Sequence, residues 1–370
     1  MVKRSKKSDH ILIGTVALSI VFGIIILASV ATSLSQQKLE RTYYYLAHQV
    51  LLGLIPGIFI AFVLSQVKLS FIKKWAPIIL VVNLFLMTLV FLPKIGTPAG
   101  QAARWINLGP ISFQPSELLK LSFTLYLATW LESRSQKTSS RSKNRFQENL
   151  AAFVVIIGLI TLLLYFQSDI STLGVIVATG VLMYFFAHTP LKHLLFIVLL
   201  GAIVLALLIK FTPYRMERIW AFLNPEIDPW GISYQIEQAL FGVGSGGIFG
   251  LGLGMSQQKS GLLPHPMSDS IFAVLAEETG FIGSAILVVL FLIFLWRGYK
   301  IGKEASNIFS RLTALGITSW IIIQAFINIG AMIGILPLTG IPLPFVSYGG
   351  SALITELAAV GILLNISKRI

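Results

Sequence analysis

The chain has 370 residues, of which 55% are hydrophobic and only 12% are charged. Soluble domains carry about 25% charged residues, so the composition excludes a soluble enzyme, a disordered regulator and a secreted disulfide scaffold. There is no cysteine, which also excludes a thiolate nucleophile and a cysteine-ligated metal. The formal net charge is +13. In a membrane protein this excess reflects lysines and arginines that hold loops on the cytoplasmic face, so it does not indicate nucleic-acid binding.

Ten apolar segments predict an all-α polytopic membrane protein. A helix that crosses the hydrocarbon core needs about 20 predominantly apolar residues, and runs without charged residues mark most of the spans. The fourth and tenth segments contain isolated charges. The predicted helices are 11–32, 46–66, 75–93, 115–133, 149–167, 170–188, 191–211, 271–296, 312–333 and 349–367. The first is too long for a signal-peptide core, and we interpret it as a retained anchor.

The distribution of Lys and Arg predicts the orientation of these spans. With the N-terminus inside, cytoplasmic segments contain 19 of these residues and outer segments contain seven. This asymmetry predicts a cytoplasmic tail at 1–10, a cytoplasmic loop at 133–148 and both termini in the cytoplasm. We expect residues 1–370 to form a single integral membrane domain.

Two outer segments predict the functional face. They are 94–114 and the long segment 212–270, between the seventh and eighth helices. Loops of this length in compact proteins are usually functional or disordered, and the aromatic and apolar content of the second argues against disorder. Any chemistry is therefore expected on the outer face.

Three acidic positions are functional candidates at membrane depth. Glu117 and Lys120, in FQPSELLK, share a helix face; they form either a structural ion pair or an anion site in which the glutamate holds the lysine. Asp269 precedes the eighth span and is either a helix cap or a general base for a hydroxyl group. Asp169 lies in the outer turn before the sixth span and either caps that helix or lines a site.

The outer side also carries cations that suit a phosphate-bearing substrate. They are Arg104, Arg215, Arg218 and Lys259, together with Lys120. A departing pyrophosphate requires such stabilisation, although a single loop cation is more often only solvated.

Several sequence motifs do not predict a dinucleotide, nucleotide or metal site in this chain. The G-x-G-x-x-G at Gly242, Gly244 and Gly247 lacks a βαβ unit, and we interpret 242–254 as flexible backbone that approaches a ligand. There is no Walker A sequence, and the five histidines do not suggest a protein-only metal site. Mg²⁺ or Mn²⁺ bound with a substrate pyrophosphate remains compatible with the sequence.

Five ordered motifs resemble one known family. FQPSELLK, YRMERI with FLNPEIDPWGISYQIEQAL, GSGGIFGLGLGMSQQK, DSIFAVLAEETG and GIPLPFVSYGGSALI resemble the shape, elongation, division and sporulation family of FtsW, RodA and SpoVE type. The likeness runs from about residue 11 to the end. LNP-x-x-DP-x-G and the terminal GILLNIS are most similar to the division-type FtsW branch.

This resemblance implies ten transmembrane helices and a peptidoglycan glycosyltransferase that uses lipid II. The family's catalytic aspartate corresponds to Asp269, and its other site positions to Arg104, Gln114, Glu117, Lys120 and Asp169. Two departures occur: serines replace the family's proline and glycine around Asp169, and Met267-Ser268 replaces a His-Thr pair before Asp269.

The expected reaction is polymerisation of glycan strands on the outer face of the bacterial cytoplasmic membrane. Asp269 would be the base, the cations would stabilise the pyrophosphate, and the glycine-rich loop would shape a sugar groove. Alternatives are a lipid II flippase, an elongation-type polymerase and a scaffold for division proteins. The resemblance implies a class B penicillin-binding protein as partner, together with other division proteins and membrane lipids.

Overall fold

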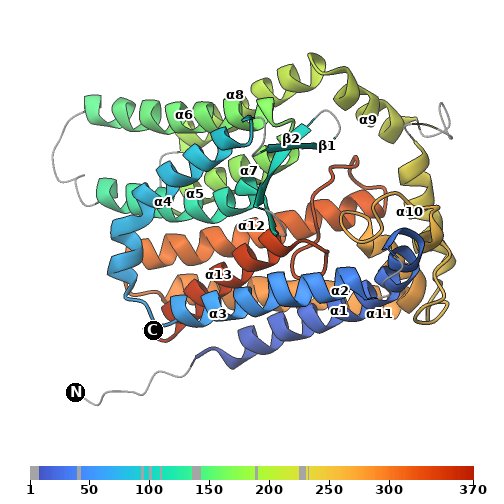
Figure 1. The fold of residues 1–370 in the computed structure, drawn as a ribbon. Coiled ribbons are helices and arrows are strands. Elements are labelled where there is room, and N and C mark those ends of the chain that lie inside the picture. The colour runs from blue at the N-terminus through green and yellow to red at the C-terminus, as the bar shows by residue number, and fades with distance from the viewer. Residues whose placement is uncertain are drawn as a thin grey trace.

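The computed structural model describes residues 8–39, 43–92, 96–99, 102–108, 111–135, 143–187, 191–224, 231 and 233–370. In this part of the chain the protein is a bundle of long helices with one small sheet (Figure 1). The first half contains α1 (His10–Leu39), α2 (Tyr44–Gln49), a π-helical turn (Val50–Leu54), α3 (Ile55–Leu64), α4 (Leu69–Leu89), α5 (Pro115–Ser135), α6 (Lys143–Phe166) and α7 (Ile170–Phe186). The second half contains α8 (Leu191–Lys210), α9 (Pro213–Leu223), α10 (Tyr234–Ser245), a 3₁₀ turn (Gln258–Ser260), α11 (Ile271–Glu304), α12 (Ile308–Met332) and α13 (Gly350–Ser367).

Each of the ten predicted spans is helical in the structure, which confirms the all-α polytopic fold class. Six helices of the described residues are long and apolar enough to cross a membrane by composition alone. Among the others, the apolar parts of α6 and α7 are shorter, at Phe153–Phe166 and Ile170–Phe186, and Leu195–Lys210 continues into Arg215–Leu223 through a 96° bend. Helix α5 has a lower hydropathy because it carries polar and charged side chains into the bundle.

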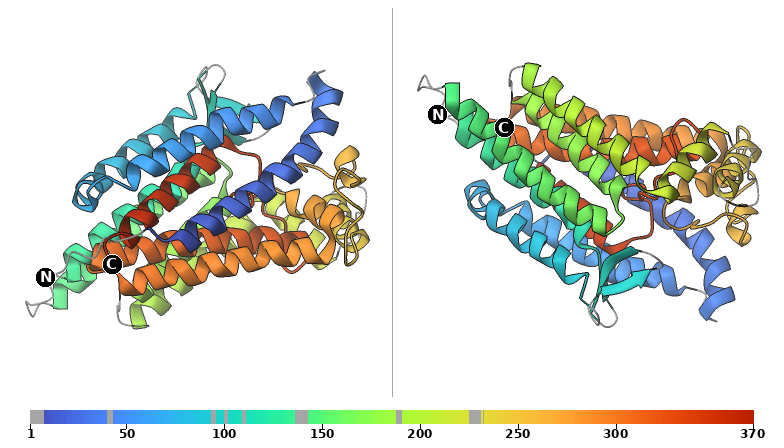
Figure 2. Two further views of the ribbon diagram at one scale, coloured as in Figure 1. Left: turned by 90° about the horizontal axis from the view of Figure 1, so that it is seen from below. Right: turned by 90° about the horizontal axis from the view of Figure 1, so that it is seen from above.

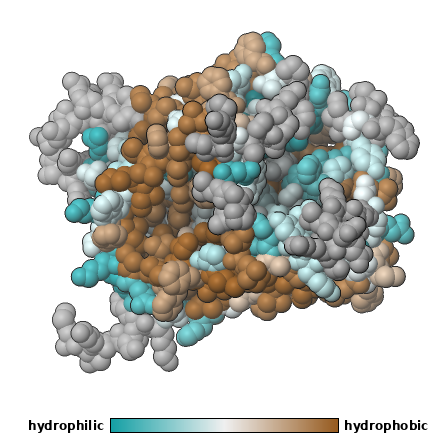
Figure 3. Space-filling view, in the orientation of Figure 1, coloured by the Kyte–Doolittle hydropathy of each residue, from teal (hydrophilic) through white to brown (hydrophobic). Residues whose placement is uncertain are grey.

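Exposed apolar side chains cover the sides of the bundle. Phe59 of α3, Val81 of α4 and Val155 of α6 are each at least 65% exposed. Figure 3 shows apolar residues across much of one face, with more hydrophilic residues towards the end formed by α9 and α10. Such a surface is stable against hydrocarbon but not against water, so it marks the membrane-facing part of the protein.

Helices α12 and α13 form the centre of the bundle. Their spans are 72% and 78% buried, whereas the other candidate spans are at most 39% buried. Figure 2 shows α13 in red between the blue α3 and the orange pair α11 and α12. Small residues allow the close approach: a Cβ at Gly361 would lie 2.4 Å from the carbonyl oxygen of Ala61 on α3.

The first described residues, near Asp9, lie on the same side of the bundle as Ser367 near the C-terminus. The backbone N–H of Asp9 donates to Ser367 Oγ at 3.4 Å, and the Asp9 carboxylate pairs with Arg297 at 2.5 Å. This arrangement agrees with an even number of spans.

The first outer segment contains a sheet that the sequence did not predict. Strands β1 (Gly96–Ala99), β2 (Ala102–Leu108) and β3 (Ile111–Phe113) pair antiparallel in the order β1-β2-β3. The register aligns Thr97 with Trp105 and Asn107 with Ser112. The sheet leads directly into α5 and places Arg104 on its central strand.

The glycine-rich segment is bound to a break in α11, which corrects the expectation of a flexible, ligand-facing loop. Gly280 interrupts α11 with φ +66°. The N–H of Phe281 donates to Gly247 O at 2.9 Å, and the N–H of Leu251 donates to Glu277 O at 2.9 Å. The loop therefore supplies backbone partners that the broken helix lacks, and its glycines allow two backbones to meet.

The substitution Gly250→Ala tests this backbone packing. A Cβ at Gly250 would lie 2.2 Å from Glu278 O, and φ is +82°. We expect a loss of about 1–3 kcal/mol in stability, measured as a lower melting temperature of the purified protein in detergent. Gly244→Ala is the control because a Cβ there meets nothing within 4 Å. Equal melting temperatures for the two variants would contradict the packing argument.

Candidate functional site

Asp269 lies immediately before α11, at the end of that helix away from Arg297, which pairs with Asp9. It is partly buried, and Ser268 Oγ donates to Asp269 Oδ1 at 3.0 Å. The N-cap of α11 is Ser270, which has no side-chain capping bond. The interpretation of Asp269 as a helix cap is therefore wrong, and its carboxylate is available for another role.

Gly340 lies beside both Asp269 and a cation. A Cβ built on Gly340 would lie 3.6 Å from Asp269 Oδ2 and 3.9 Å from Arg218 Nη1. Arg218, on α9, also donates to the carbonyl oxygen of Leu338 at 3.2 Å. The carboxylate and the guanidinium therefore lie next to the same residue of the segment between α12 and α13.

Residues 333–349 between α12 and α13, the α12–α13 loop, hold the backbone next to Asp269. Ser347 Oγ donates to Ser268 O at 2.5 Å, and the N–H of Tyr348 donates to Met267 O at 2.8 Å. The Tyr348 hydroxyl lies 3.0 Å from His48 Nδ1. Burial, followed by the neighbouring Tyr44, raises the pKa of Tyr348 to about 12, so this phenol stays protonated at neutral pH.

A second polar group surrounds the turn between α6 and α7. Arg104 donates from Nε to Gln167 O at 3.1 Å and from Nη2 to Ser168 O. Asp169 is the N-cap of α7, accepting from the Thr172 N–H at 3.3 Å. This confirms the capping interpretation of Asp169. Its carboxylate also accepts a hydrogen bond from a side chain of another helix.

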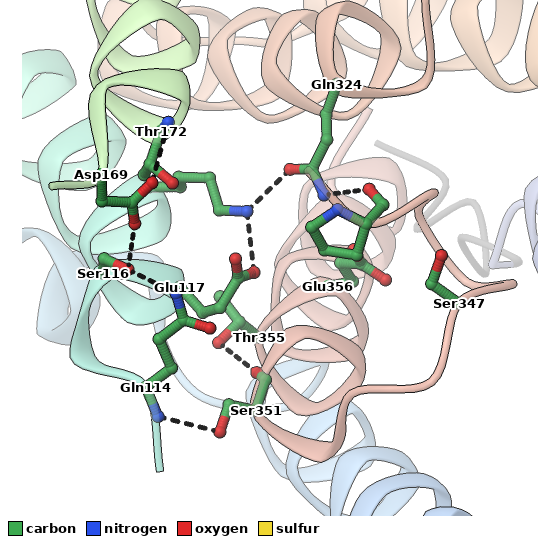
Figure 4. Close-up of polar contacts among 12 residues, drawn as sticks. Gln114, Ser116, Glu117, Asp169, Thr172, Gln324, Ser347, Ser351, Thr355 and Glu356 are labelled. Carbon is green, nitrogen blue, oxygen red and sulfur yellow. Dashed lines mark hydrogen bonds and ion pairs between the residues drawn. The ribbon is translucent and has the colours of Figure 1, made fainter. Parts of the chain in front are cut away.

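That second contact joins the turn to α5. Ser116 Oγ donates to Asp169 Oδ2 at 2.9 Å, and Gln114 Nε2 donates to Ser116 Oγ at 3.0 Å. The backbone N–H of Gln114 donates to Ser351 Oγ on α13 at 3.1 Å. Gln114 and Asp169 therefore belong to one connected set of side chains (Figure 4).

Arg215 lies beside the same turn. Its guanidinium carbon lies 5.7 Å from the ring centroid of Tyr165, and Nη1 donates to Thr212 Oγ1 at 2.9 Å. The cations of the sequence prediction thus have different surroundings: Arg104 and Arg215 flank the α6–α7 turn, and Arg218 lies near Asp269 beside Gly340.

Glu117 and Lys120 form a buried ion pair with a nitrogen–oxygen distance of 2.7 Å. Their side chains are 4% and 1% exposed. Lys120 Nζ also donates to Gln324 Oε1 at 2.7 Å (Figure 4). The structural ion pair is confirmed, and the ammonium points into the bundle instead of towards the outer surface.

Lys259 is also directed into the protein, which corrects the prediction that it joins an outer cation cluster. Its ammonium donates to Glu278 Oε1 at 3.1 Å, Ser29 Oγ at 2.9 Å and Gly254 O at 2.6 Å. Three acceptors occupy the three N–H bonds of an ammonium group. This lysine therefore fastens the outer loop to α1 and α11.

Sequence reasoning missed the polar side chains that support Asp269. Gln324 and Asn328 lie four residues apart on α12, so they share one helix face, and both are at most 1% exposed. Polar residues in an otherwise apolar span are a recognisable signal, but only the structure connects them to Asp269. Among the described residues, no three His, Asp or Glu side chains come together as a metal site.

These features define a polytopic membrane protein with a carboxylate and arginines at one end of the bundle. The family profile of FtsW, RodA and SpoVE, described as cell cycle proteins, matches residues 9–370. The chain belongs to this family.

Two curated relatives cover nearly the whole chain. Stage V sporulation protein E of Bacillus subtilis (strain 168) is 37% identical over 368 residues, covering 100% of this chain and 99% of the relative. A "Probable peptidoglycan glycosyltransferase FtsW" of Geobacter sp. (strain M18) is 36% identical, covering 99% and 98%.

Two solved structures share the fold. One, described as "Structural coordination of polymerization and crosslinking by a peptidoglycan synthase complex", has a TM-score of 0.77 and 27% identity, covering 98% of each chain. The other is the rod shape determining protein RodA of Thermus thermophilus, with a TM-score of 0.71 and 27% identity, covering 97% of this chain and 96% of RodA.

The Lys259–Glu278 pair generates a stability prediction. Lys259→Met leaves the fully buried Glu278 carboxylate without its cation, and breaking one side of a buried pair costs about 3–5 kcal/mol. We expect a marked fall in melting temperature, with a smaller fall for the double variant Lys259→Met/Glu278→Gln. Lys300→Met is the control because its 3.9 Å pair with Glu304 is nearly half exposed, and such pairs contribute little. A single variant as stable as this control would contradict the structural role.

Proposed function

We propose that this protein is a peptidoglycan glycosyltransferase that polymerises lipid II on the outer face of the cytoplasmic membrane during cell division. The observation that carries the proposal is the partly buried Asp269 carboxylate, which lies with Arg218 beside Gly340. Family membership and the names of the FtsW relatives supply the substrate class.

In the proposed reaction, the 4-hydroxyl of an acceptor GlcNAc attacks C1 of the donor MurNAc. The bond between C1 and the pyrophosphate oxygen breaks, and undecaprenyl pyrophosphate leaves with inversion at C1. Asp269 accepts the hydroxyl proton as general base. The leaving group is already activated, so one base and a set of cations are sufficient.

Three arginines are proposed to stabilise the pyrophosphate charge. Arg218 is near the base, while Arg104 and Arg215 flank the α6–α7 turn. Guanidinium groups bind phosphate oxygens through paired N–H donors. The buried Lys120 and Lys259 are left out of this set because protein acceptors surround their ammonium groups.

The proposal includes an envelope context. The protein would lie in the bacterial cytoplasmic membrane with both termini inside, and a class B penicillin-binding protein would crosslink its product. Such a partner is supported by the structurally similar chain from a peptidoglycan synthase complex, whose description names both polymerization and crosslinking. We expect the protein to be located at the septum of dividing cells. Its location along the lateral wall would instead indicate the elongation role.

A polymerisation assay tests the function. Purified protein, with and without its cognate transpeptidase, receives fluorescent lipid II, and products are resolved on a gel. We expect glycan ladders from the wild type and a rate lower by about 10²–10⁴-fold from Asp269→Ala, the range for loss of a general base.

The matched control for this assay is Glu304→Ala, which removes an exposed carboxylate from the opposite end of α11. If Asp269→Ala forms glycan ladders at the wild-type rate, Asp269 is not the general base. No ladder from the wild type with its partner bound would reject the polymerase and favour a flippase or a scaffold.

A divalent ion is proposed to act with the pyrophosphate. The described residues contain no cluster of three metal-ligating side chains, so the substrate would supply most of the oxygen ligands that Mg²⁺ or Mn²⁺ prefers. We expect EDTA to lower the polymerisation rate and excess Mg²⁺ to restore it, with the melting temperature unchanged. Full activity after metal removal, with the removal checked by elemental analysis, would exclude a role for the ion in the reaction.

A further inference from the structure

The α12–α13 loop has no regular helix or strand between Ile333 and Gly349. Much of this irregular backbone is buried, and buried backbone groups require partners within the protein. Two groups among its partners bear on the site: one joins the loop to the segment that carries Asp269, and the other joins it to buried polar side chains in the bundle.

The first group is centred on Asn328 of α12. Its amide Nδ2 donates to Asp269 O at 2.7 Å and to Ile341 O at 2.8 Å. One buried amide therefore uses both of its N–H bonds to fix the main chain of Asp269 to the loop. Ser347 adds a second connection, because its hydroxyl donates to Ser268 O and accepts from the Leu343 N–H at 2.7 Å.

The second group begins one helical turn away on α12, at Gln324. Its Nε2 donates to Pro342 O, the carbonyl after Ile341, at 2.9 Å. Its Oε1 accepts from Lys120 at 2.7 Å, and Lys120 is paired with Glu117 at 2.7 Å. Figure 4 shows this row of contacts extending from α5 to the loop.

Every side chain in this row is buried. Asn328 is 1% exposed, Gln324 is fully buried and the Lys120 side chain is 1% exposed. None of these side chains therefore lies at the surface that a substrate reaches. Burial also strengthens each bond, because the effective dielectric constant is low and water does not compete.

We infer that Gln324, Asn328 and Ser347 are positioning residues that fix the location of the Asp269 carboxylate through the α12–α13 loop. The buried Glu117–Lys120 pair acts on the reaction through this row and has no contact with pyrophosphate. The inference rests on the proposed function, because positioning matters only if Asp269 performs chemistry. A displacement of about 1 Å can lower a rate about 100-fold.

The first test compares Asn328→Ala and Ser347→Ala with the wild type in the lipid II assay. We expect kcat to fall about 10- to 100-fold, with KM within twofold of the wild type. Ser347→Thr retains the hydroxyl and should recover most of the rate. Thr313→Ala is the control, because Thr313 is a fully buried polar residue of α12 whose hydroxyl has no hydrogen-bond partner.

Melting temperatures distinguish positioning from folding. If Asn328→Ala fails to fold, the pair Ser347→Ala and Ser347→Thr decides the question alone. Folded variants with wild-type kcat, or variants that raise KM at constant kcat, would overturn the inference. An inactive wild type would instead reject the proposed function.

The second test asks how Lys120 acts. If Lys120 works through Gln324, the double variant Lys120→Met/Gln324→Met should be no slower than the slower single variant. If Lys120 binds the pyrophosphate directly, the two effects should multiply, and KM for lipid II should rise. The multiplicative result would overturn the indirect role of the ion pair.

Discussion

The whole arrangement depends on one constraint: buried backbone N–H and C=O groups must find partners inside the protein. Two irregular stretches meet it in different ways. At the break in α11, the glycine-rich loop supplies backbone groups to Glu277 and Phe281. In the α12–α13 loop, side chains such as Asn328 supply the donors. Asn328 also bonds to the carbonyl oxygen of Asp269, so the bonds that satisfy buried backbone groups also hold the main chain of the site.

The charged residues divide into two kinds according to how completely the protein surrounds them. Lys259 and Lys120 are enclosed by acceptors and connect distant parts of the chain. Arg218 and Asp269 are only partly buried. A buried ion pair adds little net stability compared with an apolar pair, but it can fix one packing arrangement. In this protein, the enclosed pairs hold separate parts of the chain together, and the proposed chemistry is assigned to the partly buried charges.

Much of the fold was predictable because its signals are local. Ten apolar runs predicted ten helical spans, and the spacing of Glu117 and Lys120 predicted a shared face. The sheet at 96–113 and the break at Gly280 were missed because each depends on a distant partner. For the same reason Lys259 was misassigned: its acceptor Ser29 lies 230 positions away in sequence. The clustering of Asp269 with Asn328 and Arg218 likewise arises only when three separate elements meet.

The break at Gly280 separates α11 into parts with different surroundings. From Phe281 to Glu304 the helix has 24 of its 34 residues, about 36 Å at 1.5 Å per residue, which suffices to cross the hydrocarbon alone. The part before Gly280 is bonded to the glycine-rich loop. A long helix adjusts to a change in bilayer thickness by tilting, and we expect the break to limit how much of such a tilt reaches Asp269.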